Sequence, residues 1–198
     1  MSLGKSGAYI TGLFDKNTWV GDDIQSAMIN STMENYIFWS VHVSATGDLS
    51  LNDTLMVSNG QPVTAVTDRL KNFIALARNN GSTKSVWFSI GSADVSDYQG
   101  VENILDNGTP AEIEVLYASF QQLMDLGADG FDFDYEENLS DPAALISKFA
   151  IGLNQNTGAQ ITFCPYYHGF WIDALIAVYK GLGSQPVVGY NLQWEYGG

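Results

Sequence analysis

Short apolar runs alternate with longer segments of helical periodicity along the chain. The longer segments repeat apolar residues every three or four positions, as a helix does when one of its faces covers a sheet. Strand and helix that alternate at this spacing are typical of a parallel sheet with covering helices. The predicted strands are residues 8–14, 36–43, 85–90, 130–135, 160–164 and 186–193, and the predicted helices are 62–77, 109–127, 140–153 and 171–179.

The helix boundaries carry recognisable capping signals. Thr109 and Glu112 form a capping-box pattern, and Pro110 stands at the first helical position. Asn80 and Gly81 are suited to close the first predicted helix. The helical assignments therefore depend on local chemistry as well as on periodicity.

Two α/β architectures fit this order of elements: an open doubly wound sheet and a barrel of eight strand–helix units. A doubly wound dinucleotide-binding sheet carries a glycine-rich turn after its first strand. Residues 14–19 read Phe-Asp-Lys-Asn-Thr-Trp and contain no glycine. We therefore expect a TIM (β/α)8 barrel. About six of its units are visible, so residues 8–198 are expected to lack the last two strand–helix units.

The composition narrows the class of protein. The 198 residues are 45% hydrophobic, which is enough for one sizeable core in a single domain. Twenty-two acidic residues against eight basic ones give a net charge of −14. This charge argues against nucleic acid or an anionic membrane as a partner, because both favour a cationic face.

Other simple features exclude further classes. No apolar run approaches the roughly 20 residues of a membrane span. Cys164 is the single cysteine, which excludes an internal disulfide and a paired Cys-x-x-Cys zinc site. Residues 1–7 lack the apolar core of a signal peptide and resemble an expression leader, so the domain is expected to begin at residue 8.

The candidate chemistry lies in residues 127–137, which read Gly-Ala-Asp-Gly-Phe-Asp-Phe-Asp-Tyr-Glu-Glu. On a strand, Asp132, Asp134 and Glu136 share one face and the aromatic residues share the other. In a barrel the carboxylates would point into the lumen, with Glu136 at the carboxyl end where barrel enzymes keep their active sites. Three carboxylates about 7 Å apart cannot all ionise comfortably there, so at least one pKa should rise. Glu136 is then the natural proton donor.

Two other interpretations of these carboxylates stay open from the residues alone. An edge strand of an antiparallel sheet also alternates acidic with aromatic residues and holds its acids in water. Carboxylates on one strand can also bind magnesium or calcium. Against a metal, no comparable acidic or histidine cluster ends another predicted strand, and His42 and His168 are isolated. We therefore expect neither a metal nor a cofactor.

Residues 129–136 resemble the signature of glycoside hydrolase family 18, the chitinase and endo-β-N-acetylglucosaminidase family, whose fourth strand reads Asp-x-x-Asp-x-Asp-x-Glu. Weaker similarities follow in the expected order. Residues 36–40, 85–92, 160–165 and 190–193 resemble the family's second, third, fifth and sixth strands.

The resemblance implies a retaining, substrate-assisted hydrolysis of β-1,4-linked N-acetylglucosamine polymers such as chitin. In that mechanism Glu136 is the acid and then the base, Asp134 orients the acetamido group of the sugar, and Asp132 tunes the protonation of Asp134. Gln193 would line the −1 subsite. Tyr196 would serve as the family's sixth-strand tyrosine if the strand bulges there.

Aromatic residues near predicted strand ends are candidates for stacking on sugar rings, although packing in the core is an alternative role for each. Tyr166 is the best placed of them, because it follows Pro165 at the end of a predicted strand. The full set is Phe14, Trp39, Tyr166, Tyr167 and Trp194.

Three alternatives accompany the chitinase hypothesis. An endo-β-N-acetylglucosaminidase acting on N-glycans would use the same residues, and a metal-binding barrel of unrelated function is a weaker possibility. A non-catalytic chitin- or glycan-binding protein on the same scaffold commonly lacks the glutamate, whereas Glu136 is present here. Because polymeric chitin does not enter cells, the substrate implies a secreted, extracellular protein.

Overall fold

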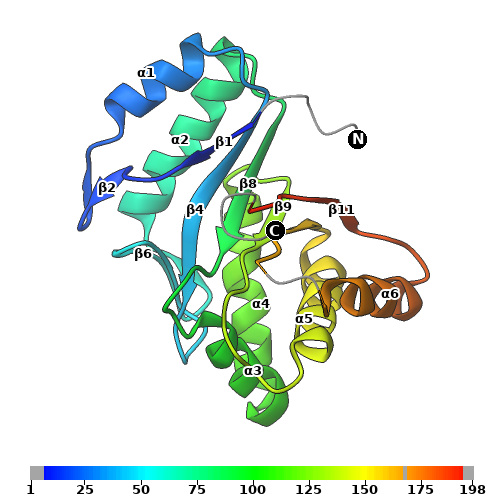
Figure 1. The fold of residues 1–198 in the computed structure, drawn as a ribbon. Coiled ribbons are helices and arrows are strands. Elements are labelled where there is room, and N and C mark those ends of the chain that lie inside the picture. The colour runs from blue at the N-terminus through cyan, green and yellow to red at the C-terminus, as the bar shows by residue number, and fades with distance from the viewer. Residues whose placement is uncertain (1–6, 167–168, 194–198) are drawn as a thin grey trace.

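The computed structural model describes residues 7–166 and 169–193, in which six parallel strands follow one another in chain order across one sheet (Figure 1). Helices connect successive strands, so the predicted α/β alternation is confirmed. Among the described residues, β1 and β11 each pair on one side only, and the sheet stays open, as expected for a barrel with six visible units. The strands are β1 (Gly7–Ile10), β4 (Asn35–Val43), β8 (Ser85–Ile90), β9 (Gly130–Phe133), β10 (Gln160–Phe163) and β11 (Val187–Tyr190). Apart from Gly7, where β1 begins, the expected leader lies outside the described residues.

All four predicted helices are present, and their ends use the expected caps. Thr109 Oγ1 accepts a hydrogen bond from Glu112 N at 3.3 Å, and the Glu112 carboxylate accepts one from Thr109 N at 2.7 Å. Gly81 follows the end of the first predicted helix. These helices are α2 (Thr64–Asn80), α4 (Pro110–Asp125), α5 (Pro142–Thr157) and α6 (Trp171–Leu182).

The N-terminal part of the fold differs from the prediction. The first predicted strand is shorter than expected, because Gly12 turns the chain at a φ of 70°. Phe14 then packs edge-on against Trp19, with 5.3 Å between ring centroids. The additional elements are α1 (Asp22–Asn30), α3 (Asp97–Asn107), a hairpin of β2 (Phe14–Asp15) and β3 (Thr18–Trp19), and an antiparallel extension of β4 formed by β5 (Leu49–Leu51), β6 (Thr54–Ser58) and β7 (Gln61–Pro62).

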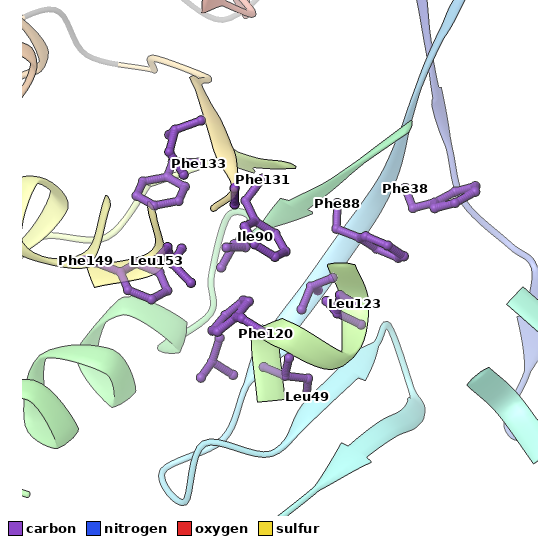
Figure 2. Close-up of a cluster of buried hydrophobic side chains, with 14 of the residues drawn as sticks. Phe38, Leu49, Phe88, Ile90, Phe120, Leu123, Phe131, Phe133, Phe149 and Leu153 are labelled. Atoms are coloured by element: carbon purple, nitrogen blue, oxygen red, sulfur yellow. The ribbon is translucent and has the colours of Figure 1, made fainter. Parts of the chain in front are cut away.

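The hydrophobic core lies between the sheet and the helices (Figure 2). Phe131 of β9 packs edge-on against Phe120 of α4, with ring centroids 5.1 Å apart. Phe133 stacks on Phe149 of α5 at 5.2 Å. Burial of each ring stabilises the fold by about 1.5–3 kcal/mol. Because successive side chains on a strand alternate, this packing directs the intervening Asp132 to the opposite face of the sheet.

One face of α6 is apolar and exposed within the described part of the chain. Ile172, Ile176 and Tyr179 are 55%, 44% and 56% exposed, and they recur at helical spacing on the side opposite the buried Val178. In the described part of the chain, no helix is long and apolar enough to cross a membrane.

Candidate active site

The carboxylate row lies in the middle of the sheet and at its carboxyl edge. β9 is flanked by β8 and β10, so the interpretation as a solvent-exposed edge strand is wrong. Asp132 is fully buried, Asp134 is 4% exposed, and Glu136 is half-buried beyond the strand. The ladder continues one residue past β9, since Asp134 N donates to Ile90 O at 2.9 Å. All three carboxylates therefore lie on β9 or on the segment that directly follows it.

Four donors surround Asp132. The register of the sheet places Ser89 of β8 and Thr162 of β10 at its level. Ser89 Oγ donates to Oδ2 at 3.1 Å, and Thr162 Oγ1 donates to Oδ1 at 2.6 Å. Asn191 Nδ2 donates to Oδ1 at 2.7 Å, and the Tyr9 hydroxyl reaches Oδ2 at 3.1 Å. Each oxygen of this fully buried carboxyl thus accepts two hydrogen bonds from protein donors.

These four partners were missed in the sequence analysis. The alternation along predicted strands could have placed Ser89 and Thr162 on the inward face. The register that brings them level with Asp132 has no local sequence signal. Tyr9 comes from β1, which lies three strands away from β9 in the order of the sheet.

Asp134 accepts one hydrogen bond at each of its oxygens. Trp39 Nε1 of β4 donates to Oδ2 at 2.9 Å, and Gln193 Nε2 donates to Oδ1 at 2.6 Å. The same Gln193 nitrogen lies 3.3 Å from Glu136 Oε1, so it connects the two outer carboxylates. The structure thus brings Trp39 and Gln193, both predicted site residues, to the carboxylate row.

Burial changes the protonation of the two inner carboxyls. It raises the pKa of Asp134 to about 7, with the hydrogen bond from Trp39 opposing this rise and the charges of Asp132 and Glu136 adding to it. Burial also raises the pKa of Asp132, against the effect of its hydrogen-bond donors. The expected pKa rise therefore falls on the inner carboxyls, and Asp134 can hold a proton behind Glu136 near neutral pH.

A cavity of about 660 Å³ opens at this edge of the sheet. Its volume is within the range of roughly 300–1,000 Å³ that small-molecule sites have. Aromatic rings, carboxylates and a thiol line it, a combination suited to a sugar ring, which has apolar faces and a polar rim. The lining includes Trp39, Asp134, Glu136, Cys164, Tyr166 and Gln193.

The remaining candidates are placed elsewhere or lie outside the described residues. Phe14 packs in the β2–β3 hairpin and does not line the cavity. His42 binds the Asp97 carboxylate through Nδ1 at 2.9 Å, while its Nε2 lies 3.1 Å from Ser40 Oγ. The candidates that lie outside the described residues are Tyr167, His168, Trp194 and Tyr196.

A metal does not fit the inner carboxylates. Protein donors already contact both oxygens of Asp132 and of Asp134. Over residues 7–166 and 169–193, no group of three or more His, Cys, Asp or Glu side chains is arranged to hold a metal ion. The carboxylate oxygens of Asp132 and Asp134, which a metal would need as ligands, are thus occupied by hydrogen bonds from the protein.

Comparison with known proteins finds similarity at the level of structure. No protein-family model matches the chain, and no curated protein matches it. The GH18 chitinase ChiB of Flavobacterium johnsoniae aligns with 95% of this chain and 53% of its own at a TM-score of 0.59 and 15% identity. A GH18 chitinase of Cycas revoluta in complex with (GlcNAc)3 aligns with 95% of this chain and 54% of its own, at a TM-score of 0.59 and 12% identity. The class V chitinase of Nicotiana tobaccum aligns with 95% of this chain and 51% of its own, at a TM-score of 0.57 and 14% identity.

These similarities show the fold. The chain has the α/β fold of chitinase-like glycoside hydrolases, and it spans about half the length of the solved structures that it resembles. Residues 129–136 suggested the same group of enzymes, and these solved structures match the chain in fold.

Proposed function

We propose that the chain hydrolyses β-1,4-linked N-acetylglucosamine polymers, with chitin as the substrate, and retains the anomeric configuration. The observation that carries this proposal is the row of Asp132, Asp134 and Glu136, which runs from a buried network to the wall of an aromatic-lined cavity. The solved chitinase complexes with N-acetylglucosamine oligomers support the choice of sugar.

The first step breaks the glycosidic bond. Glu136 gives its proton to the glycosidic oxygen, while the carbonyl oxygen of the substrate's 2-acetamido group bonds to the anomeric carbon. The bond to the leaving sugar breaks with its electron pair on the protonated oxygen. The product in the site is an oxazolinium ion, and Glu136 becomes a carboxylate.

The inner carboxyls stabilise this ion. The acetamido N–H donates to Asp134, whose negative charge balances the positive ring. Asp132 lies behind Asp134 and shares a proton with it, which the raised pKa of both groups favours. In the second step the Glu136 carboxylate takes a proton from water, the water oxygen bonds to the anomeric carbon, and the oxazolinium ring opens.

The cavity wall supplies the binding groups. Trp39 and Tyr166 offer ring faces to the sugar, and Gln193 lines the −1 subsite beside Asp134. Tyr196 would bind the acetamido carbonyl oxygen. Because the substrate is an extracellular polymer, we also propose that the protein acts outside the cell.

The test is hydrolysis of a chito-oligosaccharide, whose leaving group is a sugar, by the wild-type chain and by Glu136→Gln. Loss of the general acid should lower turnover by on the order of 10²-fold or more. The matched control is Glu114→Gln, the same change on an exposed face of α4, which should leave turnover unchanged.

Each other outcome has a defined meaning. Equal turnover by wild type and Glu136→Gln would show that Glu136 is not the general acid. A wild-type chain that binds chito-oligosaccharides without turnover would be a non-catalytic binding protein. Preferential release of an N-glycan core would indicate an endo-β-N-acetylglucosaminidase instead.

A further inference from the structure

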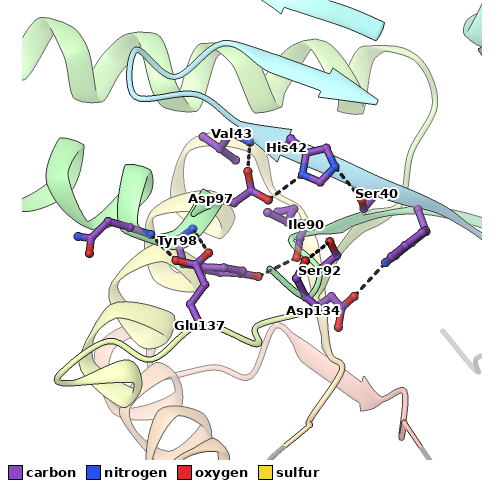
Figure 3. Close-up of polar contacts among 12 residues, drawn as sticks. Ser40, His42, Val43, Ile90, Ser92, Asp97, Tyr98, Asp134 and Glu137 are labelled. Carbon is purple, nitrogen blue, oxygen red and sulfur yellow. Dashed lines mark hydrogen bonds and ion pairs between the residues drawn. The ribbon is translucent and has the colours of Figure 1, made fainter. Parts of the chain in front are cut away.

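Glu137, the residue after the proposed acid, completes the N-terminus of α3 (Figure 3). Its Oε1 accepts from Tyr98 N at 2.8 Å, and its Oε2 accepts from Gln99 N at 2.9 Å. Amides in the first turn of a helix have no partner within the helix, and a carboxylate there also interacts favourably with the helix dipole. Ser96, the N-cap residue, makes no side-chain capping bond, so Glu137 does this from a distant segment.

The first turn of α3 is itself fixed to the sheet. Asp97 Oδ1 accepts from Val43 N of β4 at 2.7 Å, and Asp97 Oδ2 binds His42 Nδ1 at 2.9 Å. The Tyr98 hydroxyl donates to Ile90 O of β8 at 3.1 Å. The amides that Glu137 binds therefore have fixed positions relative to two neighbouring strands.

Tyr98 also packs against Tyr135, the residue that precedes the proposed acid Glu136. Its ring packs edge-on against that of Tyr135, with 5.0 Å between centroids. The Tyr135 hydroxyl in turn accepts from Leu139 N at 3.0 Å, so the turn after β9 is held at several points. Glu136 thus lies between two anchored residues.

The Glu136 side chain itself is held weakly. Within the described residues its carboxylate has one hydrogen bond, the 3.3 Å contact with Gln193 Nε2. The direction of the proposed acid is therefore set mainly by its backbone. Adjacent Cα atoms are about 3.8 Å apart, so a shift at Glu137 passes directly to Glu136.

We propose that Glu137 is a positioning residue, whose two hydrogen bonds to α3 direct Glu136 at the glycosidic oxygen. This inference rests on the proposed function. Proton donation in the transition state is sensitive to geometry, and a displacement of about 1 Å can cost on the order of 10²-fold in rate. Glu137 acts on the reaction through Glu136 and does not line the cavity.

The experiment compares Glu137→Gln with wild type on two substrates. One is a chitobiose glycoside with an activated aryl leaving group, and the other is a chito-oligosaccharide whose leaving group is a sugar. The aryl group leaves with little help from a proton, whereas the sugar needs the acid. We expect kcat/KM, which reports the steps up to cleavage of the glycosidic bond, to fall roughly 10-fold on the oligosaccharide and much less on the aryl glycoside.

Glu112→Gln is the matched control, because Glu112 is also a carboxylate that binds a backbone amide at a helix N-terminus. Both variants should lower the melting temperature to a similar small extent, but only Glu137→Gln should change the rate. In the Glu136→Gln background, Glu137→Gln should have no further effect on turnover of the oligosaccharide.

The possible failures can be told apart. An active wild type whose Glu137→Gln variant loses the same factor on both substrates, or loses nothing, overturns the positioning role alone. A wild type without turnover on either substrate overturns the proposed function, and the positioning role with it.

Discussion

The indole Nε1 of Trp39 donates to Oδ2 of Asp134 across 2.9 Å, linking β4 to the middle residue of the carboxylate row. Burial raises the pKa of Asp134, and this hydrogen bond opposes the rise. Trp39 therefore has two separable functions in the proposed site, a ring that can contact sugar and an N–H that favours the ionised form of Asp134.

Trp39→Phe should separate these functions, because phenylalanine keeps an aromatic ring and lacks the donor. A hydrogen bond to a charged group is worth about 1.5–3 kcal/mol, so the pKa of Asp134 should rise by on the order of one pH unit. We expect the pH profile of kcat/KM to shift upward accordingly. Trp19→Phe is the control, since Trp19 Nε1 donates to the exposed Asp22 away from the cavity. A profile identical to that of wild type would contradict this account.

The raised pKa of Asp134 should make the folded state less stable as the pH increases. A carboxyl whose pKa is higher in the folded state binds more protons there. The resulting loss of folding stability therefore develops between pH 3.8, the ordinary pKa of an aspartate, and about pH 7. The full cost is at most about 4 kcal/mol. Asp134→Asn should therefore show a shallower decline of the free energy of unfolding from pH 4 to pH 7 than wild type.

Denaturant unfolding at a series of pH values measures this slope. The slope is informative even though the asparagine changes the local hydrogen bonds, because those bonds do not titrate. Asp125→Asn, an exposed carboxylate bound to Gln121, should keep the wild-type slope. Parallel curves for wild type and Asp134→Asn would show that Asp134 has an ordinary pKa.

Gly91 lies in a crowded position next to the backbone of the site. It has a φ of +91°, and a Cβ there would come within 2.5 Å of Asp134 O and 2.8 Å of the Tyr98 ring. Gly91→Ala should cost about 3 kcal/mol or more and should also lower turnover, because the displaced atoms belong to the site. Gly158 has a φ of +72° but open space around it, so Gly158→Ala should cost only about 1–2 kcal/mol and leave kcat unchanged. Equal losses in the two variants would mean that the space at Gly91 is not limiting.

The exposed apolar face of α6 should promote self-association. Ile172, Ile176 and Tyr179 form an apolar stripe, and such stripes bind other apolar surfaces. Ile176→Lys should shift sedimentation toward the monomer and change the free energy of unfolding by no more than about 0.5 kcal/mol. Val178→Lys, on the buried face of the same helix, should instead prevent folding. Identical sedimentation of wild type and Ile176→Lys would show that the stripe is not involved.

Much of the fold could be predicted because its signals are local. The capping box of Thr109 and Glu112 depends on residues three positions apart, and helical or strand periodicity is visible within one element. The same is true of the carboxylate row, because strand alternation alone places Asp132 and Asp134 on one face. Where a glycine turned the chain early, as Gly12 does at a φ of 70°, the local pattern was misleading.

The environment of that row was decided by the tertiary structure. Tyr9 and Thr162 donate hydrogen bonds to Asp132 from positions 123 and 30 residues away in the sequence. Glu137 accepts one from Tyr98 N, 39 residues away. The sequence by itself determined four of the helices, the parallel strands and the row of acids, because these depend on interactions between neighbouring residues. Tertiary structure decided which strands flank the row, how deeply it is buried and therefore which carboxyls keep a proton, because register and desolvation depend on packing between distant segments.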